Sequence, residues 1–128
     1  MKEILVVDDS KVMREMIVAC LRAGSDFVFT HAASGLEAIE KLSLKPFDLV
    51  VLDLNMPDIG GVEVVEFIRS QDHMSDLPIL IVTTRGDEGS RTRVLGAGAS
   101  RFMTKPFNPE EILGEVQSLL GSSLGAPA

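Results

Sequence analysis

The sequence contains no tryptophan, no tyrosine and a single cysteine, Cys20, among its 128 residues. One cysteine excludes an internal disulfide and a metal site built from several cysteines, and it fits a reducing compartment. No apolar run approaches the roughly 20 residues that cross a bilayer, and the start MKEILVVDD lacks the pattern of a secretory signal. We therefore expect a cytoplasmic protein that does not associate with membranes, with Cys20 as a core thiol.

Basic residues are also scarce, because 12 Lys and Arg stand against 19 Asp and Glu and give a net charge of −7. Nucleic-acid binding requires a basic face, so we do not expect it here. Hydrophobic residues make up 45% of the chain. A chain of this length and composition predicts one globular domain with a substantial core.

Segments with the period of a strand alternate with segments with the period of a helix. Five apolar runs predict strands, at residues 3–7, 27–32, 49–53, 77–83 and 100–105. A helical pattern follows each of them, at about residues 11–21, 35–42, 62–70, 85–99 and 109–120. The segment 85–99 has only Val94 and Leu95 as strong apolar anchors, which predicts a weak helix.

Three of the helices have recognisable starting residues. Ser10 can cap the first helix, and Ser34 with Glu37 and Asn108 with Glu111 have the capping-box pattern. In the first helix, one apolar stripe is expected to face the core, formed by Val12, Met13, Met16, Ile17, Cys20 and Leu21.

Five strand–helix units of this spacing predict an α/β domain, in which a parallel sheet carries helices on both faces. The first, third and fourth strands are continuously apolar, as central strands must be, whereas the second and fifth contain polar residues and suit the edges. This favours a flavodoxin-like doubly wound (βα)5 fold with strand order 2-1-3-4-5. We expect the domain to span residues 1–120, with residues 121–128 as a flexible tail or the start of a linker.

Polar residues follow several of these strands where each strand ends. Asp8 and Asp9 follow the first strand, Asp53 ends the third, Thr83 ends the fourth and Lys105 ends the fifth. In a doubly wound sheet, ligands bind beyond the carboxyl ends of the strands. Each residue alone is an ordinary cap, loop or strand residue, but the five together predict one site.

The chemistry of this set favours phosphoryl transfer. Three neighbouring carboxylates repel one another unless a cation lies among them, and Mg²⁺ fits because it binds one or two carboxylates together with a phosphate. Lys105 can hold a phosphoryl oxygen, and Thr83 supplies a hydroxyl donor. Asp53 is then equipped to attack phosphorus and form an aspartyl phosphate.

With these residues in place, the chain resembles the receiver domains of the response-regulator family, and among them the free-standing chemotaxis type. The resemblance covers about residues 1–120. The motifs that carry it are ILVVDDS (Ile4–Ser10), VVLDLNMP (Val50–Pro57), Gly61, IVTT (Ile81–Thr84) and GASRFMTKPF (Gly98–Phe107).

The resemblance implies a role for each site residue. Asp53 would accept the phosphoryl group from a histidine kinase, Asp9, Asp53 and the Asn55 carbonyl would bind Mg²⁺, and Asp8 would act mainly through a metal-bound water. Thr83 and Lys105 would contact the phosphoryl group, and the Lys105–Pro106 bond would be cis. Phe102 would be the switch aromatic, without the hydroxyl that many members carry. Thr84 stands where Ala is frequent, and its bulk is expected to slow access to Asp53.

The resemblance also implies a two-component signalling switch that catalyses only its own phosphorylation and dephosphorylation and is not an enzyme with a turnover substrate. Segment 84–104 is expected to repack on phosphorylation. An output protein would then bind the surface of the fourth helix, fifth strand and last helix. The cluster Arg85, Arg91, Arg93 and Arg101 is either an ordinary solvated face or a docking site for an acidic partner.

Other functions remain open at this point. One is a Mg²⁺-dependent aspartyl-phosphate hydrolase of small substrates, although 128 residues leave little room for a region that covers a substrate. Another is a receiver used as an unphosphorylated scaffold. A flavin carrier of the same fold class is disfavoured, because no Ser/Thr/Gly-rich phosphate loop follows the first strand.

Overall fold

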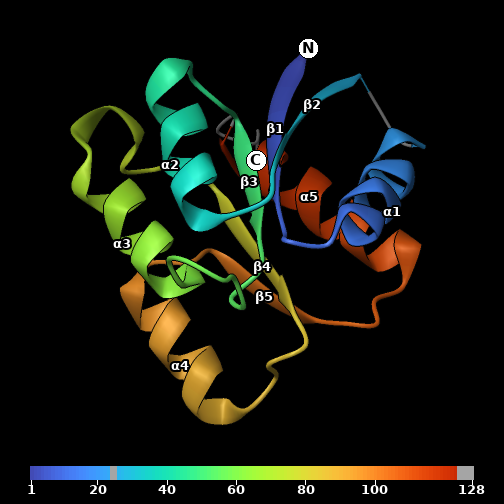
Figure 1. The fold of residues 1–128 in the computed structure, drawn as a ribbon. Coiled ribbons are helices and arrows are strands. Elements are labelled where there is room, and N and C mark those ends of the chain that lie inside the picture. Colours follow the sequence, from blue (N-terminus) through green and yellow to red (C-terminus); the bar gives the residue numbers. More distant parts are fainter. Residues whose placement is uncertain (24–25, 124–128) are drawn as a thin grey trace.

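The computed structural model describes residues 1–23 and 26–123, with the side chains of residues 122 and 123 left aside. Five parallel strands form one sheet in the order β2-β1-β3-β4-β5, which confirms the predicted order (Figure 1). The strands are β1 (Lys2–Val7), β2 (Phe27–Ala32), β3 (Leu49–Leu52), β4 (Ile79–Thr83) and β5 (Arg101–Thr104). The helices are α1 (Lys11–Arg22), α2 (Gly35–Leu44), α3 (Gly61–Ser70), the short 3₁₀ helix η1 (Asp72–Met74), α4 (Glu88–Ala97) and α5 (Pro109–Ser123).

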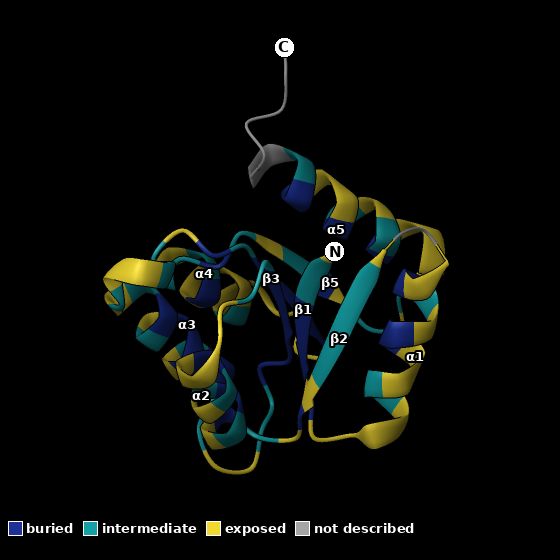
Figure 2. Cartoon of the chain, turned by 90° about the horizontal axis from the view of Figure 1, so that it is seen from above, coloured by how far each residue is buried: buried dark blue, intermediate teal, exposed yellow. Residues whose placement is uncertain are grey.

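The helices cover both faces of the sheet, as the alternating pattern predicts. Figure 2 shows α1 and α5 on one side and α2, α3 and α4 on the other. Each side has its own apolar core, and the strands contribute alternate residues to the two cores. Leu5 and Val7 pack toward α2 and α3, whereas Ile4 and Val6 pack toward α1 and α5. The central strands are therefore held between two apolar layers.

Burial along the sheet follows the predicted difference between central and edge strands. Every residue of β3 and β4 is buried, whereas β2 is mostly half-buried and β5 has two exposed residues. Strand β3 is apolar throughout, and its first charged group comes directly after its last core residue. This is where Asp53 follows Leu52.

The predicted helix starts are present, with one change of partner. The Ser10 hydroxyl accepts the N–H of Met13, and the Ser34 hydroxyl accepts the N–H of Glu37. The Glu37 carboxylate accepts the N–H of Ala33, one residue before the cap, instead of the N–H of Ser34. At α5 the Asn108 side chain accepts the N–H groups of two first-turn residues, Glu110 and Glu111.

The predicted apolar stripe of α1 is partly wrong. Val12 and Met16 are 70% and 48% exposed, whereas Ile17, Val18 and Leu21 are buried. Val12 and Met16 lie one turn apart on the flank of the helix, well away from the stripe centred on Ile17 and Leu21. Cys20 lies at the border of this stripe and is half-buried, with burial raising the pKa of its thiol.

The helix α5 continues to Ser123, three residues into the segment that is predicted to be a tail. The domain bounds of residues 1–120 stay a prediction. The rest of the predicted tail, residues 124–128, lies outside the described residues, so its flexibility stays a prediction. Within residues 1–23 and 26–123, no helix is long and apolar enough to cross a membrane.

Candidate functional site

The predicted site residues gather at the carboxyl edge of the sheet because parallel register places the strand ends together. Val7 of β1 is paired with Leu52 of β3, so the residues that follow them, Asp8 and Asp53, are neighbours. The N–H of Asp53 donates to the Val7 carbonyl (3.0 Å), which extends the pairing one residue beyond the strand. Residues that are 45 positions apart in the chain thus become adjacent.

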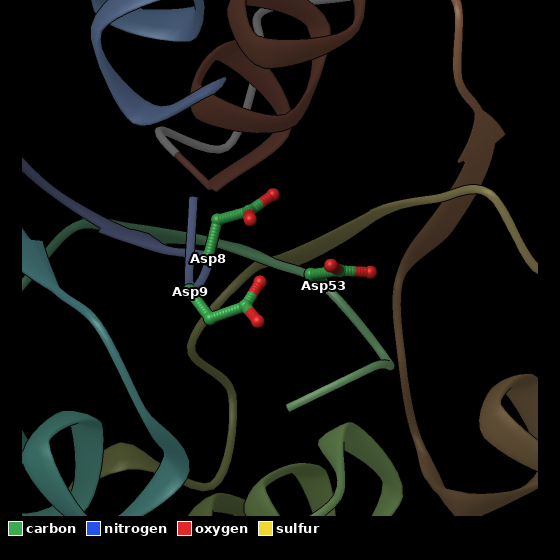
Figure 3. Close-up of side chains that lie close together, drawn as sticks. All are labelled: Asp8, Asp9 and Asp53. Atoms are coloured by element: carbon green, nitrogen blue, oxygen red, sulfur yellow. The ribbon is translucent and has the colours of Figure 1, made fainter. Parts of the chain in front are cut away.

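Three carboxylates form the centre of the site. One oxygen each from Asp8, Asp9 and Asp53 lies within 4.8 Å of the others, and Figure 3 shows the three side chains converging from the ends of β1 and β3. Asp8 and Asp53 are only 1% and 5% exposed, whereas Asp9 lies open to solvent. Buried like charges at this spacing call for a cation, and carboxylate oxygens are ligands that hard divalent cations prefer.

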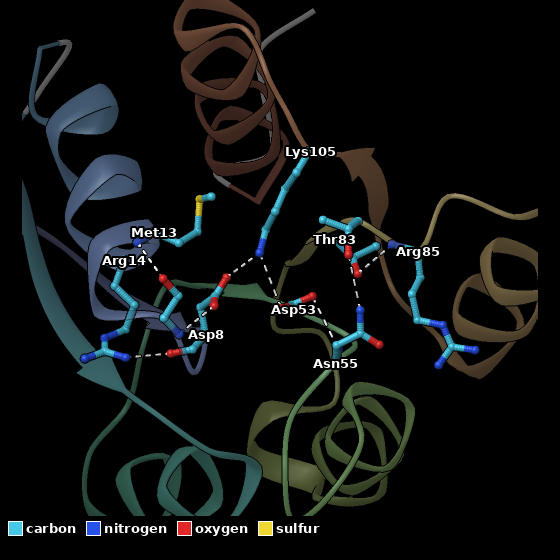
Figure 4. A network of polar contacts seen from close by, with 10 residues as sticks. Asp8, Met13, Arg14, Asp53, Asn55, Thr83, Arg85 and Lys105 are labelled. Carbon is cyan, nitrogen blue, oxygen red and sulfur yellow. Dashed lines mark hydrogen bonds and ion pairs between the residues drawn. The ribbon is translucent and has the colours of Figure 1, made fainter.

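Lys105 brings a positive charge between the two buried acids. Its Nζ lies 2.6 Å from Asp8 Oδ2 and 3.3 Å from Asp53 Oδ2. Both contacts are drawn as dashed lines in Figure 4. Burial alone lowers the pKa of Lys105, but its contacts with Asp8 and Asp53 outweigh that effect, so the pKa is raised and the ammonium stays charged. Three carboxylates and one ammonium leave two negative charges, which a divalent cation can neutralise.

The backbone of Lys105 is hydrogen-bonded to β4, and this contact fixes the position from which the side chain extends. The Lys105 N–H donates to the Thr83 carbonyl (2.8 Å), which prolongs the pairing of β4 and β5. The Lys105–Pro106 peptide is cis, as the resemblance implies.

Thr83, the last residue of β4, and Asn55, in the loop after β3, lie beside Asp53 (Figure 4). Thr83 is fully buried, and its hydroxyl oxygen accepts the N–H of Arg85 (3.2 Å). The Asn55 N–H donates to Asp53 Oδ1 (3.3 Å), and its side-chain amide donates to the Thr84 hydroxyl (3.4 Å). These contacts join the loops after β3 and β4 beside Asp53.

Phe102 lies away from the carboxylates but on the path from Thr83 to α4. It is paired with Ile81 on β4, two residues before Thr83 and on the same face of the sheet. Its ring is half-buried against the core beneath α2, α3 and α4, and the Arg91 guanidinium lies 5.7 Å from the ring centroid. Phe102 therefore lies on the strand next to Thr83 and contacts Arg91 of α4.

Two supports of the site have no signal in the local sequence. The Arg14 guanidinium donates to the Asp8 backbone carbonyl, and Asp58 accepts the N–H groups of Gly35 and Leu36 at the start of α2. The second contact joins residues 23 positions apart, so it depends on the path of two loops. An analysis of long-range pairs could have found the second contact, whereas the first joins residues six positions apart and depends on the reach of the Arg14 side chain.

Cavity size does not identify this site. The larger surface cavity, of about 590 Å³, lies beside the start of β1, at the opposite end of the sheet, and is lined by residues such as Leu44, Phe47 and Met74. A second, of about 530 Å³, lies between α4, β5 and α5 and is lined by residues such as Glu88, Arg91 and Glu111. The acidic site is identified by its converging charges instead.

Comparison with known proteins agrees with this geometry. The family model of the response regulator receiver domain matches residues 4–117. The chain therefore belongs to the receiver domain family of response regulators, whose CheY-like members act in two-component signalling with histidine kinases and downstream targets.

Among individual proteins, the chain is similar to single-domain chemotaxis regulators. It is 38% identical over 129 residues to the chemotaxis protein CheY homolog of Campylobacter jejuni, covering 98% of each chain. The crystal structure of CheY4 of Vibrio cholerae superposes with a TM-score of 0.85 at 34% identity, over 93% of this chain and 98% of that one.

A further similar structure is relevant to the three carboxylates of the site. The receiver domain of the sensor histidine kinase PA1611 from Pseudomonas aeruginosa has a TM-score of 0.85 at 30% identity, over 94% of this chain and 98% of that one. Its structure holds a magnesium ion coordinated in the active site cleft.

Proposed function

We propose that this chain is the phosphorylatable receiver of a His-Asp phosphorelay and that Asp53 accepts the phosphoryl group. The observation that carries the proposal is the bridge of Lys105 between Asp8 and Asp53, with the Asp9 carboxylate within 4.8 Å. A purely structural buried charge is normally neutralised by a partner, whereas this cluster retains an excess of negative charge at the rim. Such an excess suits a site that takes up a cation and a phosphoryl group.

The residues present fit a magnesium ion, because all three side chains offer hard oxygen ligands and the cluster is half open to water. Asp9, Asp53 and the Asn55 carbonyl would hold the ion, and Asp8 would act through a bound water. When bound, Mg²⁺ neutralises charge on the phosphoryl oxygens. The magnesium in the PA1611 receiver structure supports this assignment.

The other residues would position and stabilise the transferred group. An Asp53 oxygen forms the new bond to phosphorus while the bond from phosphorus to the donor histidine nitrogen breaks, and that nitrogen keeps the electron pair. The Lys105 ammonium would leave Asp53 for a phosphoryl oxygen, and the Thr83 hydroxyl would donate to another. The chain would thus catalyse only its own phosphorylation and dephosphorylation.

The output surface would be that of α4, β5 and α5, around the 530 Å³ groove. Movement of Thr83 toward the phosphoryl group would let Phe102 and α4 repack. The arginines near this groove are already engaged in part, since Arg101 pairs with Glu115 at 2.9 Å and Arg91 stacks on Phe102. Repacking of Phe102 would therefore also change where Arg91 lies.

The relatives support a cytoplasmic role in chemotaxis signalling. Chemotaxis proteins of the CheY type match this chain over nearly their whole length. We propose the same type of arrangement here, in which a histidine kinase supplies the phosphoryl group and a separate protein binds the output surface.

The direct test is to incubate the protein with acetyl phosphate and Mg²⁺ and to locate the added mass by peptide mapping. One phosphoryl group on the peptide that contains Asp53, and none in the Asp53→Asn variant, is expected. Modification elsewhere, or none at all with Mg²⁺ present, would refute the proposal. Steady turnover of an external phosphomonoester would favour the hydrolase instead, and full signalling by Asp53→Ala would favour the scaffold.

The switch has its own test. Amide exchange is compared with and without beryllofluoride plus Mg²⁺, which together imitate the phosphoryl group. Protection is expected to change within residues 84–104. Unchanged protection in this segment, in protein shown to bind beryllofluoride, would mean that the site binds the phosphoryl mimic but that residues 84–104 do not respond to it.

A further inference from the structure

Arg14 of α1 reaches the acidic turn although no motif singles it out. Its Nη1 donates to the backbone carbonyl of Asp8 at 2.6 Å, and Figure 4 shows the guanidinium beside that carbonyl. Its Nε donates to Nδ1 of His31 on β2 at 3.2 Å. One side chain thus joins an edge strand and the first helix to the backbone that carries two of the three acids.

The two neighbouring acids differ in how they are held. The Asp8 carboxylate accepts the Ser10 N–H at 2.9 Å and the Lys105 ammonium at 2.6 Å. Within residues 1–23 and 26–123, no hydrogen bond or ion pair holds the Asp9 carboxylate, which is exposed. The direction of Asp9 therefore depends on the peptide between Asp8 and Asp9, and the oxygen of that peptide is the one that Arg14 binds.

The guanidinium itself is oriented from both ends. Burial and then the nearby Arg14 lower the pKa of His31, so the imidazole is neutral at pH 7 and Nδ1 can accept the Arg14 N–H. Because the guanidinium is planar, fixing Nε at His31 also fixes the direction of Nη1 toward Asp8.

We propose that Arg14 is a positioning residue that holds the Asp8–Asp9 peptide so that the Asp9 carboxylate faces a divalent cation. This inference rests on the proposed function, in which Asp8, Asp9 and Asp53 hold that cation. The positive charge of Arg14 by itself repels a cation, whereas its hold on the backbone favours binding. Loss of the charge would raise the Mg²⁺ affinity, whereas loss of the backbone contact would lower it. The direction of the affinity change in an Arg14 variant therefore shows which effect is the larger.

The test is calorimetric titration of Mg²⁺ into the wild-type protein and into Arg14→Met. Supports of metal ligands typically change metal affinity by 10–100-fold, and we expect Arg14→Met to bind Mg²⁺ about 10-fold more weakly. Unchanged or tighter binding would overturn the proposal, because only the charge would then matter. The matched control is Arg22→Met, which removes the same charge from the last turn of α1, where Arg22 lies over the Phe29 ring; wild-type affinity is expected.

A second variant guards against a folding defect in Arg14→Met. Arg14→Lys keeps the charge but replaces two separate donors by one ammonium, so it cannot hold Asp8 and His31 in the same way. We expect its Mg²⁺ affinity to lie between those of the wild type and Arg14→Met. Full wild-type Mg²⁺ affinity in Arg14→Lys would contradict a role that requires hydrogen bonds to both Asp8 and His31.

A readout without metal isolates the positioning. In metal-free protein, the amides of Asp9 and Ser10 are expected to exchange faster in Arg14→Met than in Arg22→Met, and equal exchange would count against the proposal. If wild-type protein binds Mg²⁺ and is phosphorylated on Asp53 while Arg14→Met binds equally well, only this inference fails. If the wild type does not bind Mg²⁺, the proposed function itself fails.

Discussion

Asp9 shows how the site differs from the core that surrounds it. Asp8 and Asp53 each share the Lys105 ammonium, but Asp9 adds a third negative charge within 4.8 Å of them. Local repulsion of this kind lowers stability and persists where function needs it. Asp9 is therefore the least useful of the three acids for folding and the one most accessible to the proposed cation.

The first prediction concerns Asp9→Asn. Loss of one like charge is expected to raise the free energy of unfolding of the metal-free protein by up to about 1 kcal/mol, since unit charges ~4 Å apart in water interact by about that amount. Mg²⁺ at 100 times its Kd should stabilise the wild type by about 2.7 kcal/mol and Asp9→Asn far less. Urea unfolding with and without Mg²⁺ measures both, and equal stabilisation of the two proteins would remove Asp9 from the metal site.

The second prediction concerns access to Asp53. Thr84 is exposed and accepts a hydrogen bond from the Asn55 amide across the mouth of the site. Thr84→Ala removes this bond and the methyl group, so phosphorylation by acetyl phosphate should be about 2- to 10-fold faster, given the ~0.5–1.5 kcal/mol of one hydrogen bond. Thr92→Ala on the exposed side of α4 is the control. An equal or slower rate in Thr84→Ala would contradict a gating role.

At the scale of single elements, α4 is held less firmly than its neighbours. Among its described residues only Val94 is buried, and the helix is capped at its N-terminus by Asp87, whose side chain accepts the Ser90 N–H. Its C-terminal cap is Gly98, which has a φ of 120° and whose carbonyl accepts the Arg69 Nε–H at 2.9 Å. Firm ends and a sparsely buried middle suit an element that repacks as a unit.

A pair of glycines in this region gives the third prediction. Gly96 is helical with nothing within 4 Å of an added Cβ, so Gly96→Ala should stabilise the protein by about 0.5–1 kcal/mol. Gly98→Ala should destabilise it by at least about 1–2 kcal/mol, because its φ is left-handed and a Cβ would lie 2.8 Å from Arg69 Cγ. Urea unfolding measures the change in the free energy of unfolding for each variant, and changes of the same sign would contradict the observed geometry of the two glycines.

The fourth prediction concerns the loop after β3. The pKa of Asp58 is lowered by the N–H of Ile59 and, further, by those of Leu36 and Gly35. Because the folded pKa lies below the ordinary value of 3.8, the contribution of Asp58 to stability is present above about that pH and is lost as the pH falls through the folded pKa. Between pH 5 and pH 2.5, the free energy of unfolding measured with urea should decrease less steeply for Asp58→Asn than for the wild type. Parallel pH profiles of the two proteins would refute this role of Asp58.

At the scale of the whole molecule, the strand order brings the site residues together. This order was predictable from the apolar pattern of the strands in the sequence. Continuously apolar strands had to be central, and parallel strands had to end at one edge, so Asp8, Asp53, Thr83 and Lys105 converge. Helix flanks were less predictable, because Val12 and Met16 are apolar yet exposed. The contacts of Arg14 and Asp58 were not predictable, because they depend on how far each side chain reaches in the folded structure.

The central claim is that a divalent cation among the three carboxylates lets Asp53 accept a phosphoryl group. The most direct measurement is the rate of phosphoryl uptake from acetyl phosphate as a function of Mg²⁺ concentration, followed by intact mass. The account predicts negligible uptake after chelation and a hyperbolic rise whose midpoint matches the calorimetric Kd for Mg²⁺. Uptake on Asp53 at the same rate with and without Mg²⁺ would contradict it.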